Sequence, residues 1–221
     1  MRSLVIAFVG AVVFSSQALA ADAAKNFEGF SVQFGTGYQS VKGKTSNLVT
    51  VPASVVSVSD STMNEVPAVL GVAYTFALTD KFLLGVDFEY DALKSKDGQS
   101  NVFLNNALIV NGGSKNKTQD VMTLSLKPGY VVNDTTAIYA KLGYFTTKST
   151  CTNDDASACA STNFKGYTLG GGAKMLIDKN VYLFAEASYI KASDKAGRNG
   201  TTTFTTGAQG YNTIIGVGYK F

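Results

Sequence analysis

The last eleven residues, from Tyr211 to Phe221, constrain the fold of this chain more than any other segment. Every second side chain in this stretch belongs to a largely apolar set with aromatics at both ends, and the interleaved set is mostly small or polar. Because side chains alternate between the two faces of a strand, this pattern predicts a β-strand long enough to cross a bilayer when tilted. An unpaired apolar strand would recruit other chains. We therefore expect it to pair with the first strand of the same chain.

Four positions of this strand resemble the carboxy-terminal assembly signal of bacterial outer-membrane β-barrel proteins. They are Ile214, Gly216, Tyr219 and Phe221. The resemblance implies that the barrel-assembly machinery reads this signal and is a partner of the chain.

The amino end has the pattern of a secretory signal peptide. Arg2 precedes an apolar run from Leu4 to Phe14, and small residues follow up to Ala18 and Ala20. This pattern predicts cleavage after Ala20, which removes residues 1–20 and leaves a β-barrel domain over 21–221. A retained membrane anchor is the alternative, but the apolar run is too short to span a bilayer comfortably.

The composition favours strands and argues against a catalytic site. The chain has 22 glycines, 14 phenylalanines and 11 tyrosines but only three prolines, and it has no histidine. Histidine is the commonest general base and metal ligand, so we predict no catalytic residues, no metal and no cofactor. The net charge of +3 gives no argument for nucleic-acid binding.

Seven further segments alternate apolar and polar residues as the last one does. These segments are 26–39, 68–76, 84–91, 121–130, 138–145, 167–175 and 183–189. Short turns at 77–81, 132–136 and 178–180 alternate with long connections at 42–65, 93–119, 147–163 and 192–209, and 102–110 suggests an additional strand outside the membrane. Short periplasmic turns and long outer loops are typical of outer-membrane barrels. The predicted fold is all-β, an eight-stranded antiparallel up-and-down transmembrane β-barrel.

Six charged residues fall on the small, polar face of these strands. They are Asp87, Glu89, Lys127, Lys141, Lys174 and Glu186. A Lys or Arg facing lipid near the midplane costs roughly 2 to 4 kcal/mol, so we expect the six to form a charge network in the lumen. Glu89 should sit just above the layer that the others share. The network is either a structural plug or the guard of an ion pathway, and the narrow lumen of an eight-stranded barrel favours the plug.

The architecture resembles the small eight-stranded family that includes the OmpA membrane domain, OmpX, OmpW and opacity-type proteins. The resemblance implies a non-enzymatic outer-membrane protein with a structural and surface-contact role through its long loops. A small channel or lateral-diffusion pore, as in OmpW, is the alternative, and a lipid-modifying enzyme is disfavoured by the absence of histidine. A soluble lipocalin-like calyx would carry its apolar face inside, which the larger apolar faces here argue against.

The loop regions suggest further partners and one covalent link. Cys151 and Cys159 lie in a polar stretch, and two cysteines in an exported protein favour a disulfide. Besides outer-membrane lipid, we expect lipopolysaccharide as a partner, with Lys42 and Lys165 the best candidates to pair with its phosphates. We also expect a host or cell-surface ligand at the loops, and we expect the protein to be a monomer.

Overall fold

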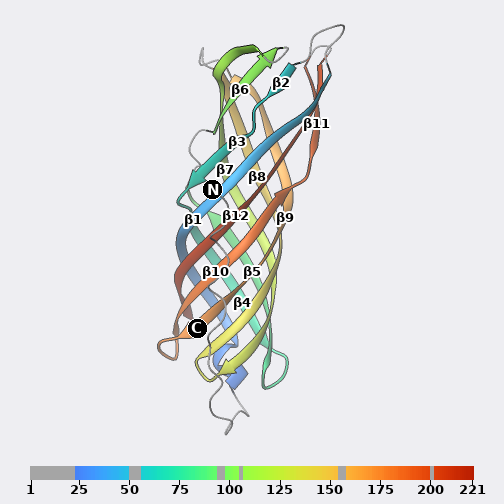
Figure 1. Cartoon of the computed structure of the whole chain (residues 1–221). Coiled ribbons are helices and arrows are strands. Elements are labelled where there is room, and N and C mark those ends of the chain that lie inside the picture. Colours follow the sequence, from blue (N-terminus) through green and yellow to red (C-terminus); the bar gives the residue numbers. More distant parts are fainter. Residues whose placement is uncertain (1–22, 50–55, 94–97, 105–106, 154–157, 200–201) are drawn as a thin grey trace, which may run out of the picture.

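The computed structural model describes residues 23–49, 56–93, 98–104, 107–153, 158–199 and 202–221. Eight of its strands form the barrel: β1 (Gly29–Val49), β4 (Ala68–Ala77), β5 (Phe82–Asp91), β7 (Ala107–Asn133), β8 (Thr136–Asn153), β9 (Ala158–Leu176), β10 (Val181–Ala192) and β12 (Thr202–Lys220). Their order is β12-β10-β9-β8-β7-β5-β4-β1, all antiparallel, and β12 pairs with β1 to close the cylinder (Figure 1). The predicted up-and-down barrel is confirmed.

The closing pair explains why the chain needs an apolar final strand. Its register runs from Ser31 opposite Lys220 to Val49 opposite Thr203, and the Phe221 amide donates to the Phe30 carbonyl over 2.9 Å. In hydrocarbon no water is present to satisfy an open strand edge, so closure removes the cost of unpaired backbone groups.

The two faces of the sheet have the predicted chemistry. Leu70, Leu126 and Val217 point outward, where their side chains are 43–50 % exposed, whereas Gln33 and Ser125 point inward and are 6 % and 2 % exposed. A calyx would have the opposite arrangement. The apolar outer face lies against lipid.

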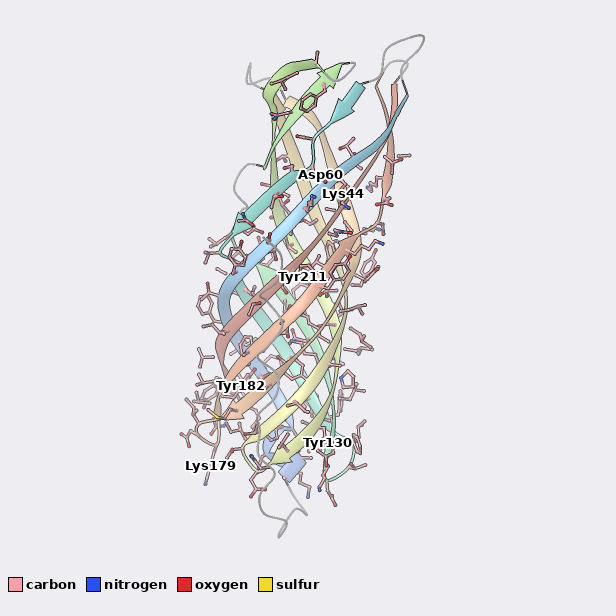
Figure 2. All side chains as sticks on the ribbon, viewed as in Figure 1. Lys44, Asp60, Tyr130, Lys179, Tyr182 and Tyr211 are labelled. Carbon is pink, nitrogen blue, oxygen red and sulfur yellow. The ribbon has the colours of Figure 1, made fainter. Side chains whose placement is uncertain are left out.

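Aromatic residues border this apolar face at both ends. At the periplasmic end Phe82 packs on Tyr130, and at the outer end Tyr189 packs on Tyr211, with ring centroids 5.4 and 5.2 Å apart. Along β12, Tyr211 to Phe221 is ten steps, about 34 Å of strand, which gives about 26 Å along the membrane normal at a tilt of about 40°. This height matches the apolar band of outer-membrane barrels. Tyr211 lies near mid-height in Figure 2, and the strands continue far above it.

Much of what we expected to be long connections is strand. β8 and β9 continue as one hairpin, in which Thr152 lies opposite Ala158, and β1 and β12 continue to their outermost pair at Val49. Four short strands join this outer part: β2 (Val56–Val58), β3 (Ser61–Glu65), β6 (Gly98–Leu104) and β11 (Lys195–Asn199). The single strand expected over 102–110 is wrong, because β6 ends at Leu104 and pairs back on β7 from Ala107. The sequence of this outer part has no apolar alternation comparable to that of the lipid-facing strands, so the pattern did not predict it as strand.

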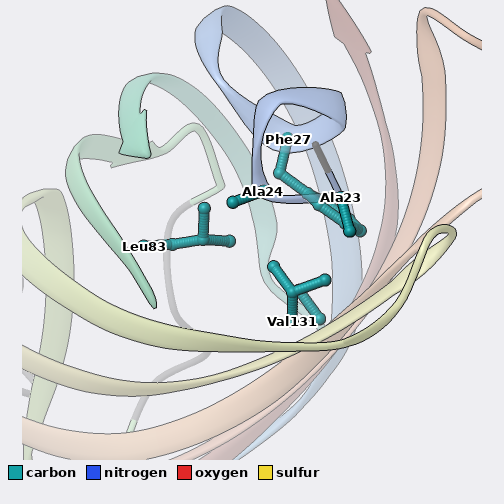
Figure 3. Close-up of a cluster of buried hydrophobic side chains, with 6 residues drawn as sticks. Ala23, Ala24, Phe27, Leu83 and Val131 are labelled. Atoms are coloured by element: carbon teal, nitrogen blue, oxygen red, sulfur yellow. The ribbon is translucent and has the colours of Figure 1, made fainter. Parts of the chain in front are cut away.

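A short 3-10 helix, η1 (Ala23–Phe27), lies across the periplasmic mouth of the barrel (Figure 3). Ala23, Ala24 and Phe27 are buried against Leu83 and Val131 of β5 and β7. The expected strand start at residue 26 is therefore wrong, and the first strand begins at Gly29. That glycine has a φ of +124°, which other residues rarely adopt, and it turns the chain from the helix into β1.

The proposed signal peptide, with Ala18 and Ala20, lies outside the described residues. Within the described part of the chain, no helix has the length and apolarity required to span a membrane.

Candidate functional site

Five charged residues of the lumen come from four strands whose inward positions converge. Asp87 and Glu89 lie on β5, Lys127 on β7, Lys141 on β8 and Glu186 on β10. Except for Glu89, whose side chain is 13 % exposed, each residue is at most 5 % exposed. The alternation of each strand puts these side chains in the lumen, and the register of the ladders sets them at similar depth.

Two ammonium groups and three carboxylates form one connected layer. The Lys127 Nζ lies 2.8 Å from Asp87 Oδ2, 3.0 Å from Glu89 Oε1 and 3.1 Å from Glu186 Oε2. The Lys141 Nζ lies 2.6 Å from Glu89 Oε2 and 2.5 Å from Glu186 Oε1. Glu89 is thus part of the layer and not above it, since it bridges both lysines. We call Asp87, Glu89, Lys127, Lys141 and Glu186 the charge layer.

Lys174 does not join the charge layer by an ion pair with any described carboxylate. Its Nζ lies over the ring of Tyr182, 4.9 Å from the centroid, and 5.9 Å from the centroid of Tyr139. A lysine over an aromatic face is stabilised by the ring quadrupole. With Lys174, the six residues named from the sequence carry three formal positive and three formal negative charges, and Asp91 on β5, 8 % exposed, adds one more buried carboxylate toward the outer end.

Neutral side chains connect the charge layer to the barrel wall. The Gln33 amide donates to Asp87 Oδ2 over 3.0 Å, and the Tyr139 hydroxyl donates to Glu186 Oε2 over 3.2 Å. The Tyr182 hydroxyl in turn donates to Gln33 Oε1 over 3.2 Å. Sequence reasoning did not single out these residues. The alternation predicts that their side chains face the lumen, but nothing in the sequence distinguishes an uncharged residue that bonds to the charge layer from any other on that face.

The space left below the charge layer is very small. A cavity of about 20 Å³ is lined by Phe27 of η1 and by Asp87, Lys127, Tyr139 and Lys174, among others. Such a volume holds about one water molecule. Oδ1 of Asp87 is buried without a hydrogen-bond partner in the protein, so a water at this position would satisfy it.

Inward-facing glycines make room for the rings that fill the lumen. A Cβ at Gly172 would lie 2.4 Å from the Ala185 carbonyl oxygen and 2.7 Å from the Tyr139 hydroxyl. One at Gly216 would lie 2.2 Å from the Phe34 carbonyl oxygen and 2.5 Å from the Phe184 ring. The first position belongs to the glycine run at 170–172, so packing inside the lumen accounts for one glycine of that run. The second shows that one residue of the proposed assembly signal also has a packing role.

The remaining residues of the proposed assembly signal lie where the strand pattern predicts. Ile214 is 4 % exposed in the lumen, and Tyr219 and Phe221 are exposed on the lipid face at the periplasmic end. Their rings pack on each other with centroids 5.1 Å apart. Their recognition during assembly stays a prediction.

The two cysteines lie opposite each other in the outer hairpin. Cys151 of β8 is the Cα partner of Cys159 of β9, next to a shift in register that begins at Ser149. Directly opposed residues on antiparallel strands have Cα atoms about 4.5 to 5.5 Å apart, which a disulfide can span.

The two lysines proposed to bind lipopolysaccharide differ in their surroundings. Lys42 pairs with Asp60 of the outer region, with 2.8 Å between Nζ and Oδ2, and this hydrogen bond lowers the pKa of Asp60. Lys165 on β9 is exposed and has no ion pair with a described residue.

The comparisons with known proteins agree with this architecture. A family model for the outer membrane protein beta-barrel domain matches residues 6–221. The fold is similar to that of the outer membrane protein OprG of Pseudomonas aeruginosa, with 17 % identity, coverage of 88 % of this chain and 96 % of that one, and a TM-score of 0.54.

Two other solved structures show the same fold. Neisserial surface protein A has 15 % identity, coverage of 88 % and 98 %, and a TM-score of 0.51. The outer membrane protein AlkL, determined in lipid bilayers, has 15 % identity, coverage of 96 % and 97 %, and a TM-score of 0.50. None of the proteins of curated function matches in sequence. The family match covers nearly the whole chain, and the chain belongs to the outer membrane protein β-barrel family of the bacterial outer membrane.

Proposed function

We propose that this protein is a non-enzymatic outer-membrane barrel whose lumen is a structural core and whose protruding strands make surface contacts. The observation that carries the proposal is the charge layer, in which every lysine and every carboxylate contacts an opposite charge inside the lumen. In this proposal the charge layer is a structural plug that closes the lumen.

The energetics of buried charge favour a closed layer. Separating ion pairs in a low-dielectric interior leaves uncompensated charges, and removing one partner of such a pair typically costs about 3 to 5 kcal/mol. An aqueous path would require Lys127 and Lys141 to leave carboxylates that they contact at 2.5 to 3.1 Å. Below the layer, η1 occupies the mouth. Both features support a lumen that does not conduct.

The absence of an enzymatic role is part of the proposal. The chain contains no histidine, and the carboxylates and lysines of the charge layer are committed to one another. A general base or nucleophile must reach its substrate, and these groups lie at most 13 % exposed inside the barrel.

The outer strands supply the contact surface. The β8–β9 hairpin and the extended β1–β12 pair carry the barrel wall beyond the tyrosines of the outer end. We place the contacts with a host or cell-surface ligand on this part. A disulfide between Cys151 and Cys159 would fix the hairpin, and the loop-entropy estimate for so short a ring is about 2 to 3 kcal/mol, local to the hairpin.

Export and assembly follow the same proposal. The signal peptide is removed after Ala20, the barrel-assembly machinery recognises the final strand, and the closed wall lets the chain function as a monomer in the membrane. The pairing of β1 with β12 supports the monomeric state, because no strand edge within the lipid requires a partner.

Single-channel recording on the mature protein in planar bilayers tests the closed lumen. We expect no steady openings from the wild-type protein or from the Glu89→Gln/Lys141→Gln variant. Steady openings of the wild type that the double substitution abolishes would identify a pore and contradict the plug.

A hairpin variant tests the surface role. Replacing residues 149–162 by Asn-Gly joins Lys148 to Asn163, which are already opposite each other, through a turn suited to a β-hairpin. We expect the variant to keep the heat-dependent shift in gel mobility of a closed barrel and to lose adhesion of expressing cells to host or bacterial surfaces. Adhesion unchanged from wild type would remove this hairpin from the contact surface.

A further inference from the structure

Three lysines on the outer surface stand in a row that crosses three neighbouring strands. They are Lys148 on β8, Lys165 on β9 and Lys191 on β10, and all three are exposed. Lys148 pairs with Asn163, two residues from Lys165, and Lys191 pairs with Tyr167, two residues from Lys165 on its other side. Each step is therefore a diagonal cross-strand neighbour, for which the separation is about 7 to 8 Å. We call the three residues the lysine row.

The lysine row lies next to the outer tyrosines, and its side chains are on the same, lipid-facing side of these strands. Tyr144 pairs with Tyr167, and Tyr189 pairs with Tyr211 on β12. Tyrosines at this level mark the boundary between hydrocarbon and headgroups. The lysine row therefore lies at the depth of the phosphates of the outer leaflet, as the position of Tyr211 in Figure 2 helps to place.

The charge of the lysine row is not neutralised within the described protein. Lys148, Lys165 and Lys191 form no ion pair with a described carboxylate, in contrast to Lys42, which pairs with Asp60 at 2.8 Å. Asp194, which follows close after Lys191, points toward Gly207 of β12 instead. On the opposite flank of the barrel β4 and β5 contain no lysine or arginine. These two strands therefore contribute no positive charge to the outer surface.

We infer that the lysine row is a binding site for the phosphate groups of a lipid headgroup in the outer leaflet. Three ammonium groups about 7 to 8 Å apart suit an anion that carries more than one phosphate, and each lysine near a membrane surface contributes about 1 kcal/mol toward anionic lipid. The ligand class is a multiply phosphorylated lipid, held by its acyl chains against the apolar wall and by its phosphates at the row. This inference does not depend on whether the lumen conducts.

Native mass spectrometry of the detergent-solubilised mature protein tests this site, with diphosphoryl lipid A, phosphatidylcholine and inorganic phosphate as separate probes. We expect wild-type protein to retain diphosphoryl lipid A in preference to phosphatidylcholine. The Lys148→Gln/Lys165→Gln/Lys191→Gln variant should lose at least tenfold in apparent affinity. The corresponding triple Arg variant should keep binding, because it keeps the charges.

The matched control removes three exposed lysines at the periplasmic end: Lys25 of η1, and Lys81 and Lys179 in periplasmic turns. This control should bind lipid A as the wild type does, and all variants are first checked for the gel shift of a folded barrel. Equal loss in the control variant would show a net-charge effect and overturn the site. Retention by the Gln variant would overturn it too, and displacement of lipid A by millimolar inorganic phosphate would show a free-phosphate site.

Discussion

At the scale of single residues, the lumen is packed so that glycine and aromatic side chains fit against each other. We predict that Gly172→Ala destabilises the barrel by about 1 to 3 kcal/mol, the usual range for overpacking. The added Cβ would lie 2.4 Å from the Ala185 carbonyl oxygen and 2.7 Å from the Tyr139 hydroxyl, which is held by its hydrogen bond to Glu186. Urea unfolding of the protein in lipid vesicles measures the change.

Gly43→Ala is the control for this substitution. Gly43 lies on the outer part of β1, where a Cβ would meet only the Ser61 carbonyl, at 3.8 Å. We expect its unfolding midpoint to stay close to that of the wild type. An equal loss in both variants would show that glycine is needed for the backbone conformation and not for space in the lumen.

The charge layer gives a second prediction at this scale. Lys141→Met removes the ammonium that contacts Glu89 at 2.6 Å and Glu186 at 2.5 Å, so a carboxylate is left without its closest partner. We predict a loss of about 3 to 5 kcal/mol in the same unfolding measurement, because a buried unpaired charge is costly. Lys179→Met in an exposed turn should change stability by less than about 0.5 kcal/mol. A Lys141→Met protein as stable as wild type would contradict the ion-paired core.

At the scale of the elements, the short strand β3 is held to β1 partly by Glu65, outside the membrane-spanning part. Burial raises the pKa of Glu65 to about 7, the neighbouring Asp91 carboxylate adds to the rise, and the hydrogen bond from Gln39 opposes it. Because the pKa is higher in the folded protein than the ordinary value of 4.5, the stabilising contribution is complete below pH 4.5. It is lost as the pH rises through about 7.

Hydrogen exchange of the β3 amides measures this pH dependence. We predict that the exchange protection of residues 61–65, corrected for the intrinsic rate, falls between pH 5.5 and pH 8.5. In Glu65→Gln the protection should be the same at both values, since the amide does not titrate. A wild-type protein with constant protection would contradict the role of Glu65.

The elements also show what the sequence could and could not predict. Alternation identified which side chains of seven barrel strands face lipid, as at Leu126 and Ser125, because lipid lies on one face and a polar lumen on the other. For the segment 138–145 the cost of placing Lys141 in lipid decided between the two faces. Alternation failed above the tyrosines, where β1 continues to Val49 through residues such as Lys42 and Lys44 that show no apolar alternation. It also missed η1, since five residues with three buried apolar side chains are too short to show a period.

The sequence predicted which charged residues lie in the lumen but not which of them contact one another. Parity and the cost of charge in lipid placed all six charged residues in the lumen. Which of them touch depends on strand register, and register follows from turns and from bulges such as the one at Asp120, where φ is +55°. Glu89 therefore bridges the two lysines of the layer, and Lys174 lies over tyrosine rings instead.

At the scale of the whole molecule, the barrel is a closed cylinder (Figure 1). Its outside is apolar, its inside is charged and filled, and its strands project beyond the membrane. The outside fixes its place in the bilayer. The inside replaces the apolar core that a water-soluble domain would use. The projecting strands and the lysine row are then the parts that other molecules can reach.

The orientation of the two faces is the central claim, and site-directed labelling tests it most directly. In a Cys151→Ser/Cys159→Ser background, single cysteines at Leu126 and at its neighbour Ser125 carry a fluorophore in reconstituted vesicles. We predict that a nitroxide on the lipid acyl chains quenches the label at 126 strongly and the label at 125 weakly. A water-soluble quencher that reaches 126, together with acyl-chain quenching at 125, would contradict the account.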